Sequence, residues 1–333
     1  MNKYYIKTVL LSALAAVLIS GCKSPSPESI KRSGLYFDTY ISVEIYGNND
    51  IKLLDDVFNL CDKYEHLFSP TVNGSDIYNI NHSNGDTIKI SPESYNILND
   101  SLKYCNQSDG TFDITIYPLT KLWNFSDTSS HIIPSSKEIA SILPHIDYHN
   151  INMDSSDYSI YLDDKESAID VGAIAKGYIA DRIKDYLIGK DVTSAVINMG
   201  GDITLIGSKG ENVPFTIGIT DPNNKGNALM GLSLSDISVA TSGIYERSFT
   251  EEGRLYHHIL DPTTGYPCET DITSVTVITQ SAEDADAICT LCILNGSDKA
   301  LELINSMNDT EAIIIKRDGT VLKSKQADKY IKN

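Results

Sequence analysis

The chain has 333 residues and a formal net charge of −18 at pH 7, from 45 acidic and 27 basic residues. With 41% apolar and 22% charged residues, it has the composition of an ordinary folded globule, long enough for one large domain or two fused domains. A surface this acidic repels nucleic-acid phosphate and anionic lipid headgroups, which argues against both as partners.

The first 22 residues have the pattern of an export signal. Lys3 and Lys7 form a positive start, residues 8–19 are mostly apolar, and Ser-Gly-Cys closes the segment. We therefore predict a secretory signal peptide over residues 1–21. The ending resembles a bacterial lipobox, which implies cleavage before Cys22 and a lipid on its thiol; the alternative is an ordinary signal peptide with an incidental cysteine. A lipobox would anchor the protein to the membrane of a bacterial cell envelope through the lipid alone, facing outside the cytoplasm.

Residues 22–33 begin with that cysteine and contain Ser-Pro-Ser-Pro. This composition predicts a flexible, disordered tether between the anchor and the folded body. No convincing linker follows, so we expect one domain over residues 34–333.

Beyond the tether, the apolar periodicity predicts helices and strands in irregular alternation. Strands are expected over 35–46, 194–198, 274–279 and 311–316, with several more between 203 and 239 and a closing strand after an Asp-Gly turn at 318–319. Helices are expected over 50–68, 92–104, 136–144, 173–187 and 282–294, three of them opened by capping serines at 91, 135 and 281. Because no regular βαβ rhythm appears, we predict an α+β fold.

Five cysteines follow Cys22, and an odd number argues against a full disulfide framework in an exported chain. Cys289 and Cys292 have CxxC spacing but lie inside the apolar run AICTLCIL. We favour buried thiols that pack on a helix face; a redox pair is the alternative.

The stretch AIDVGAIAKGYIAD, residues 168–181, places two glycines and a lysine between an apolar run and a helix. Gly172 and Gly177 have the separation found in a Walker A loop, but Lys176 precedes the second glycine, so this is not a P-loop. Glycines allow close backbone approach, helix N-terminal amides attract an anion, and the lysine adds a positive charge. An anion site and a purely structural helix start both remain open.

Two further stretches offer ligand groups. NMGGD, residues 198–202, forms a tight turn at the mouth of a strand, where its backbone either contacts a ligand or only reverses the chain. Asp286 and Thr290 are four residues apart, so their oxygens share one face of a helix. Carboxylate plus hydroxyl suits a hard cation such as Mg²⁺, which an acidic protein would need to neutralise a phosphorylated ligand. The alternative is a solvated charge at Asp286 and a packing role for Thr290.

The stretch YHHILDPTTGYP, residues 256–267, pairs His257 and His258 just before a turn. A histidine is a candidate general base near neutral pH. A core or surface histidine without a chemical role is the alternative.

Six stretches together resemble the ApbE family, the FAD:protein FMN transferases, many of which are lipoproteins. They occur in the family's order and span nearly the whole exported body. They are GTFDITIYPLTKLW (110–123), IDVGAIAKGYIAD (169–181), INMGGD (197–202), VATSGIYERSF (239–249), YHHILDPTTGYP (256–267) and SVTVITQSAEDADAICT (274–290). The resemblance implies an α+β fold with T-fold-like features, mixed or antiparallel sheets and packed helices.

The resemblance also assigns site residues by position. Asp286 and Thr290 match the metal-binding side chains, and Ala173 matches the residue that offers a backbone carbonyl to the metal, which would be Mg²⁺ or alternatively Mn²⁺ or Ca²⁺. His258 matches the implied catalytic base. The positions that match FAD contacts are Phe37, Thr111, Phe112, Asp113, Ile114, Asp170, Lys176 and Leu260. Phe37 stands in place of the methionine of the family's Met-Gly-Thr, and Tyr117 stands where a glycine is usual.

The implied activity is metal-dependent transfer of FMN from FAD to a threonine or serine hydroxyl of another protein, with release of AMP. The acceptor motif of the family's targets resembles [ST]-G-A-T, and no such run occurs in this sequence. We therefore expect a different exported protein as the acceptor, such as an electron-transfer protein. Two alternatives remain: a Mg²⁺-dependent FAD pyrophosphatase that yields FMN and AMP, and a non-catalytic FAD-binding lipoprotein.

Overall fold

The computed structural model describes residues 28–127, 131–224 and 226–332. Within these ranges, no helix combines the length and the apolar character that crossing a membrane would need. The signal peptide and Cys22 lie outside them, so both stay predictions.

Helices and strands follow one another in the irregular order that the sequence predicts. The helices are α1 (Ile51–Phe68), α2 (Asp76–Asn81), α3 (Pro92–Gln107), α4 (Tyr117–Trp123), α5 (Ser136–Ile142), α6 (Ala175–Ile188), α7 (Ala282–Asn295) and α8 (Ser297–Ser306). The strands are β1 (Ser29–Tyr36), β2 (Thr39–Tyr46), β3 (Ile88–Lys89), β4 (Ile151–Asp154), β5 (Ser159–Leu162), β6 (Ala195–Met199), β7 (Asp202–Ile206), β8 (Phe215–Thr220), β9 (Ala228–Leu234), β10 (Ser238–Gly243), β11 (Ser248–Glu251), β12 (Arg254–His257), β13 (Ile272–Thr279), β14 (Glu311–Lys316) and β15 (Val321–Lys323).

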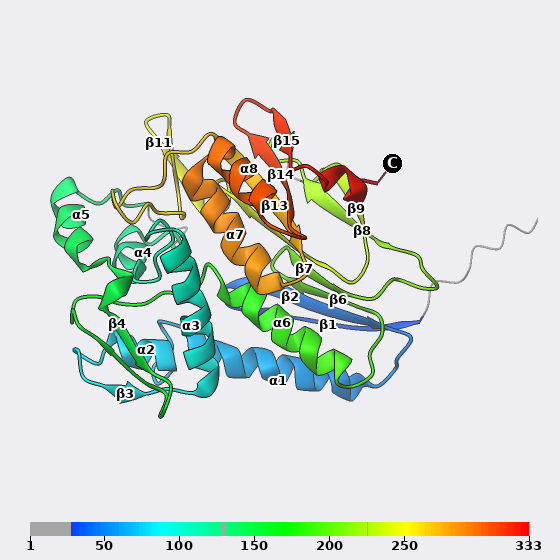
Figure 1. Ribbon diagram of the computed structural model, residues 1–333, viewed down its shortest axis with the longest axis horizontal. Coiled ribbons are helices and arrows are strands. Elements are labelled where there is room, and N and C mark those ends of the chain that lie inside the picture. Colours follow the sequence, from blue (N-terminus) through cyan, green and yellow to red (C-terminus); the bar gives the residue numbers. More distant parts are fainter. Residues whose placement is uncertain (1–27, 128–130, 225, 333) are drawn as a thin grey trace, which may run out of the picture.

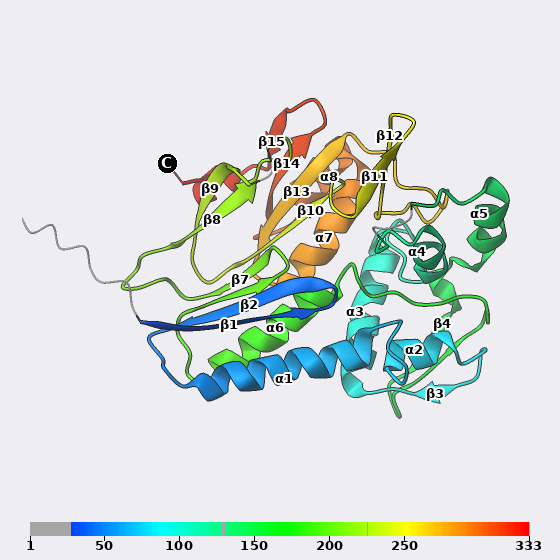
Figure 2. The same cartoon turned by 180° about the vertical axis from the view of Figure 1, so that it is seen from behind.

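The centre of the fold is an eight-stranded sheet in the order β1-β2-β6-β7-β10-β13-β14-β15. Every neighbouring pair in it is antiparallel. Helices α1, α6, α7 and α8 cover one face, and the view from behind shows the strands in front of them (Figures 1 and 2). The β8–β9 hairpin packs its apolar side chains on strands β7, β10 and β14. This arrangement confirms the α+β prediction.

Helices α6 and α7 touch at a glycine, and this contact aligns two parts of the site. A Cβ added to Gly177 would lie 2.2 Å from the carbonyl oxygen of Ala282, so only glycine allows this approach. One turn further along α6, the Asp181 carboxylate accepts hydrogen bonds from the Ser281 hydroxyl and from the amides of Ala282 and Glu283, at 3.0–3.1 Å. The carboxylate therefore satisfies free amides at the start of α7 and fixes the two helices relative to each other.

The first strands differ from the prediction. The sequence predicts a single strand over 35–46, but β1 and β2 form a hairpin whose two-residue turn, Phe37 and Asp38, has φ of 53° and 55°. Positive φ at both positions matches the twist of a tight hairpin. The strand β1 also begins at Ser29, inside the predicted tether, because residues 29–33 pair with β2.

The capped helices and the buried cysteines agree with the sequence. The hydroxyls of Ser91, Ser135 and Ser281 each accept a backbone N–H at the start of their helices. All five described cysteines are buried and unpaired, as packing residues would be. Burial raises the pKa of the Cys292 thiol to about 12, which makes it unreactive and argues against the redox alternative for the CxxC pair.

Candidate functional site

Three charged side chains meet where α6 begins, and we call Lys176, Asp202 and Asp286 the acid–lysine cluster. The Lys176 Nζ atom lies 2.6 Å from Asp286 Oδ1 and 3.1 Å from Asp202 Oδ2. Asp286 comes from α7 and is 2% exposed, and Asp202 opens β7 directly after the Gly200-Gly201 turn and is 7% exposed. The cluster therefore joins two helices to the central sheet. Because Asp286 is buried, the alternative that its carboxylate is a solvated surface charge is wrong.

Burial and mutual attraction compete within this cluster. Burial favours the neutral amine of Lys176, but Asp202 and Asp286 outweigh it and raise the pKa of the lysine above its usual value. Burial also raises the pKa of Asp286, against the opposing effect of Lys176. By formal charge, two carboxylates and one ammonium leave the cluster with one negative charge in excess, which favours a bound cation.

The predicted metal ligands fit such a cation. The Gly177 amide donates to Asp286 Oδ2 at 3.1 Å, although the Ala175 and Tyr178 amides donate to the Val171 and Ile174 carbonyls in the usual helical pattern. The Ala173 carbonyl is thus released from its ordinary helical partner, Gly177. Thr290 lies one turn after Asp286 and is partly exposed. Carboxylate, hydroxyl and carbonyl oxygens are donors that Mg²⁺ accepts, and no group of three His, Cys, Asp or Glu side chains arranged for a metal occurs among the described residues.

The loop before α6 is held on both sides. The Asn81 side chain donates to the Ile169 carbonyl at 2.9 Å and accepts from its amide at 2.6 Å, while the Asp170 amide donates to the Ile114 carbonyl at 2.8 Å. Asp170 Oδ1 then accepts from the Gly172 amide at 2.8 Å. The structure therefore fixes the backbone around Asp170, one of the predicted FAD contacts.

In the 111–114 segment, the side chains of residues 112–114 are buried and stabilise the fold. Phe112 and Ile114 are 3% and 1% exposed and belong to the apolar core. The buried Asp113 carboxylate accepts from the amide and hydroxyl of Thr115 and from the Tyr148 amide, at 2.6–3.0 Å. Any ligand contact of these three residues would fall to backbone atoms, whereas Thr111 is partly exposed.

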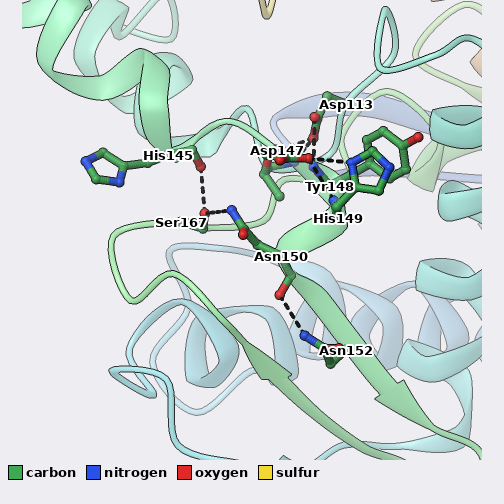
Figure 3. A network of polar contacts seen from close by, with 9 residues as sticks. Asp113, His145, Asp147, Tyr148, His149, Asn150, Asn152 and Ser167 are labelled. Carbon is green, nitrogen blue, oxygen red and sulfur yellow. Dashed lines mark hydrogen bonds and ion pairs between the residues drawn. The ribbon is translucent and has the colours of Figure 1, made fainter.

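A polar network ties the 145–152 segment to both neighbouring loops (Figure 3). At one end, the Tyr148 amide donates to the Asp113 carboxylate. At the other end, the Ser167 hydroxyl donates to the His145 carbonyl at 2.6 Å and accepts from the Asn150 side chain at 3.1 Å. The network thus connects the Asp113 segment to the residues that precede Asp170.

Phe37 and Leu260, two further predicted FAD contacts, belong to different parts of the fold. Phe37 occupies the β1–β2 turn, and its amide donates to Glu65 Oε1 at 2.8 Å. The turn neighbours the cluster, since the Gly200 amide donates to the Tyr40 carbonyl at 3.1 Å. Leu260 is 6% exposed, so its side chain packs in a small core and does not face a ligand.

The predicted base His258 follows β12 and has a fixed ring orientation. Its Nδ1 atom lies 3.1 Å from the Glu246 carbonyl, which can only accept, so Nδ1 carries the proton and Nε2 keeps its lone pair. Burial chiefly, and then the charge of Arg247, lower the pKa of His258 to about 4. The imidazole is therefore neutral at physiological pH. By contrast, His257 is 1% exposed, and its Nε2 contacts the Cys268 carbonyl at 3.2 Å, as in the core alternative.

Two cavities lie near these residues but away from the acid–lysine cluster, and the smaller one touches Asp113, a predicted FAD contact. One of about 390 Å³ borders Asp113 and Pro262, and one of about 630 Å³ lies beside Tyr104 and Glu283 at the start of α7. Neither is lined by a member of the acid–lysine cluster or by His258.

Several residues of the site were not predicted from sequence. Asp202 closes the NMGGD stretch, whose sequence signals only a backbone turn, and its Oδ1 accepts from the Thr241 amide at 3.0 Å. Asn81 belongs to no stretch that the sequence singled out. Arg247 lies in VATSGIYERSF, where its charge was the available signal.

Known proteins resemble this chain along most of its length. The ApbE family model matches residues 37–314. The FAD:protein FMN transferase of Klebsiella pneumoniae (strain 342) is 33% identical over 294 residues, covering 88% of this chain and 90% of the relative. The FAD:protein FMN transferase of Treponema pallidum (strain Nichols) is 28% identical, covering 96% of this chain and 92% of the relative.

Solved structures agree. The ApbE protein of Thermotoga maritima MSB8 aligns with a TM-score of 0.85 at 28% identity, covering 92% of this chain and 100% of the other. The Vibrio cholerae flavin transferase ApbE aligns with a TM-score of 0.82 at 22% identity, covering 91% and 99%, and supports the fold alone. Since the family model spans most of the sequence and a relative of 33% identity covers most of the chain, the protein belongs to the ApbE family.

Proposed function

We propose that this protein transfers FMN from FAD to a serine or threonine hydroxyl of an exported acceptor protein and releases AMP. The names of the curated relatives support the reaction class. The observation that carries the proposal is the acid–lysine cluster, a buried site with net negative charge beside a free backbone carbonyl and a threonine hydroxyl. Such a site suits a divalent cation and, through it, a diphosphate.

The reaction forms one bond and breaks one. The acceptor hydroxyl oxygen attacks the phosphorus atom of the FMN half, and the bond from that phosphorus to the bridging oxygen breaks. AMP leaves with the bridging oxygen, and the hydroxyl proton passes to a base. FMN then remains attached to the acceptor as a phosphodiester.

His258 supplies the base in this proposal. Because Nδ1–H donates to the Glu246 carbonyl, the free lone pair of Nε2 is available to take the hydroxyl proton. A neutral imidazole at physiological pH, with its pKa lowered by burial, satisfies the requirement for an unprotonated base.

Asp286, Thr290 and the Ala173 carbonyl would hold Mg²⁺, with Mn²⁺ or Ca²⁺ as alternatives. The metal, when bound, neutralises negative charge that develops on the leaving phosphate. Lys176 holds the two buried carboxylates together and orients Asp286. The backbone around Asp170, fixed by Asn81 and Ile114, would line the flavin dinucleotide.

We also propose that the protein acts outside the cytoplasm as a lipid-anchored component of a bacterial cell envelope. The support is the sequence pattern that ends at Cys22. Globomycin treatment of producing cells should leave an uncleaved precursor, and a Cys22→Ser variant should lose membrane attachment. Normal processing and membrane retention of that variant would contradict a lipid anchor.

Comparing the exported proteins of cells with and without this chain by mass spectrometry should identify the acceptor through its added FMN mass. The purified protein, FAD, Mg²⁺ and that acceptor should then give a fluorescent acceptor band on a denaturing gel and one AMP per flavin attached. EDTA should abolish labelling and excess Mg²⁺ restore it, and an acceptor with alanine at the modified residue is the matched control. Free FMN without labelled acceptor would contradict transfer and indicate a pyrophosphatase, whereas FAD that stays intact for hours would indicate a binding protein.

A further inference from the structure

We propose that Arg247 is a substrate-binding residue whose guanidinium contacts the diphosphate of FAD. This inference rests on the proposed function, since it assigns the contact to the same site. Arg247 lies in the turn between β10 and β11, next to Ser248, which pairs with His257 across the β11–β12 hairpin. It therefore stands beside His258, whose Nδ1 donates to the carbonyl of the preceding residue, Glu246.

The family resemblance implies that Lys176 contacts FAD, but in the structure its amine binds two carboxylates of the protein. Lys176 contacts two buried carboxylates at 2.6 and 3.1 Å, so its charge is already compensated. Arg247 differs, because it is exposed and its guanidinium makes no hydrogen bond or ion pair with any other described residue. A protein of net charge −18 thus keeps an uncompensated cation at the site.

The charge of Arg247 acts on two residues from different parts of the site. Burial raises the pKa of Asp170 and the charge of Arg247 opposes that rise, whereas burial and Arg247 together lower the pKa of His258. The guanidinium is therefore close enough to act on both the loop predicted to contact FAD and the predicted base, and the bond from His258 to the neighbouring Glu246 carbonyl places Arg247 beside the base. A diphosphate that reaches both would pass the guanidinium.

The backbone at Arg247 is unusual for a long side chain. Its φ is 39°, a left-handed value that non-glycine residues with bulky side chains rarely adopt. Such conformations concentrate at functional sites, where the surrounding structure maintains them. Here the bond from His258 to the Glu246 carbonyl holds the peptide before Arg247 and also orients the base.

Guanidinium chemistry favours the diphosphate as its ligand. The planar fork of N–H donors matches two phosphate oxygens at once, and its charge persists at every physiological pH. The adenosine and riboflavin parts of FAD are neutral, so they gain no comparable charge-assisted bond.

The test uses ADP as the probe, because ADP carries the diphosphate without the flavin. Calorimetry at fixed Mg²⁺ should show that Arg247→Ala weakens ADP binding about 10- to 100-fold, as expected for lost hydrogen bonds to a charged group, while adenosine binding stays unchanged. Arg247→Lys should recover part of the ADP affinity. Arg254→Ala is the matched control: it removes the same charge from the adjoining β11–β12 hairpin, where Arg254 lies over the Tyr256 ring and 3.5 Å from Glu269.

ADP affinity of Arg247→Ala within twofold of wild type, or an equal loss in Arg254→Ala, would overturn the assignment. An equal loss of ADP and adenosine affinity would also overturn it, because the defect would then not concern phosphate. The proposed function is tested by a different measurement. If the wild-type protein binds ADP but labels no acceptor, the proposed FMN transfer is wrong, and the ADP affinities of the variants still decide whether Arg247 binds the diphosphate.

Discussion

Lys176 on α6 and Asp286 on α7 form a partly buried ion pair across 110 residues of sequence, with 2.6 Å between Nζ and Oδ1. The neighbouring Gly177 amide donates to the other carboxylate oxygen. The Asp286 side chain thus binds both the Lys176 ammonium group and a backbone amide in the first turn of α6. Asp202 shares the same amine from the sheet. Asp286 therefore combines a predicted metal-binding role with a visible structural one, and a test must separate them.

Asp286→Asn separates the two roles. Asparagine keeps an oxygen that accepts from the Gly177 amide, and Lys176 keeps Asp202, so the melting temperature should fall by only a few degrees. The loss of the carboxylate charge should lower FMN transfer about 100-fold or more. Asp284→Asn, an exposed position on the same helix, should leave transfer unchanged. Transfer by Asp286→Asn within a few-fold of wild type would remove Asp286 from metal binding.

His258→Asn tests the base. The asparagine amide can still donate to the Glu246 carbonyl, so the loop should keep its shape while the proton acceptor is lost. We expect transfer to fall about 10²-fold or more and ADP affinity to change by less than about threefold. His149→Asn, which changes an exposed histidine paired with Asp147, should have no effect on transfer.

The pH dependence gives a second readout of the same residue. Because the pKa of His258 is lowered to about 4, the ring stays unprotonated as the pH falls from 8 to 5, and it should not limit the rate there. A steep loss of activity with a midpoint near 6.5, absent in His258→Asn, would contradict this environment.

Local signals predicted much of the fold. The sequence predicts the starts of three helices from their capping serines, Ser91, Ser135 and Ser281. Each hydroxyl accepts a hydrogen bond from an amide only three residues away, so the signal is local. Sequence does not predict the β1–β2 turn because Phe37 is an unusual residue at positive φ and no glycine marks the turn.

The site was harder to predict, because its contacts are not local. Asp202, Lys176 and Asp286 meet only after β6, β7 and β10 have paired and α6 has crossed α7. Sequence could place a carboxylate and a hydroxyl on one face of α7, but not show that a lysine from α6 already binds the carboxylate. For the same reason, sequence alone points to Lys176 as the cation for a bound diphosphate, because it cannot show that Lys176 is paired with carboxylates while Arg247, among the described residues, is not.

Gly177→Ala tests the helix contact that aligns the site. Alanine has a higher helix propensity than glycine by about 1 kcal/mol, so propensity alone predicts a more stable protein. Its Cβ, however, would lie 2.2 Å from the Ala282 carbonyl oxygen and 2.7 Å from Glu283 Cα, both backbone atoms that cannot rotate away. We expect the unfolding free energy to fall by about 3 kcal/mol, with loss of transfer, because the clash outweighs propensity.

The matched control is Gly210→Ala, where an added Cβ meets no atom within 4 Å and φ is not positive. Urea unfolding should show this variant within about 0.5 kcal/mol of wild type. A Gly177→Ala protein as stable as wild type would mean that α6 and α7 can separate without cost, and Asp286 would then not be positioned by this contact.

His257 should make the protein sensitive to acid. Its Nδ1 is buried without a hydrogen-bond partner among the described residues, and burial, opposed by the Cys268 carbonyl, lowers its pKa to about 4. The unfolded state, with a pKa near 6.5, binds the proton more readily, so this contribution to stability is complete above pH 6.5 and is lost as the pH falls towards 4. The loss amounts to about 3 kcal/mol at pH 4.

His257→Gln isolates that contribution, since the glutamine amide can donate to the Cys268 carbonyl in place of Nε2–H but does not titrate. Unfolding free energies from urea titrations at pH 7.5, 6.0, 5.0 and 4.5 should fall less steeply for His257→Gln than for wild type. Exposed His149→Gln should keep the wild-type slope. Comparing variants cancels the opposite dependence of Asp286, whose raised pKa makes the native state bind the proton more readily. Equal slopes for His257→Gln and wild type would mean that the buried ring accepts a proton as readily as it does in the unfolded chain.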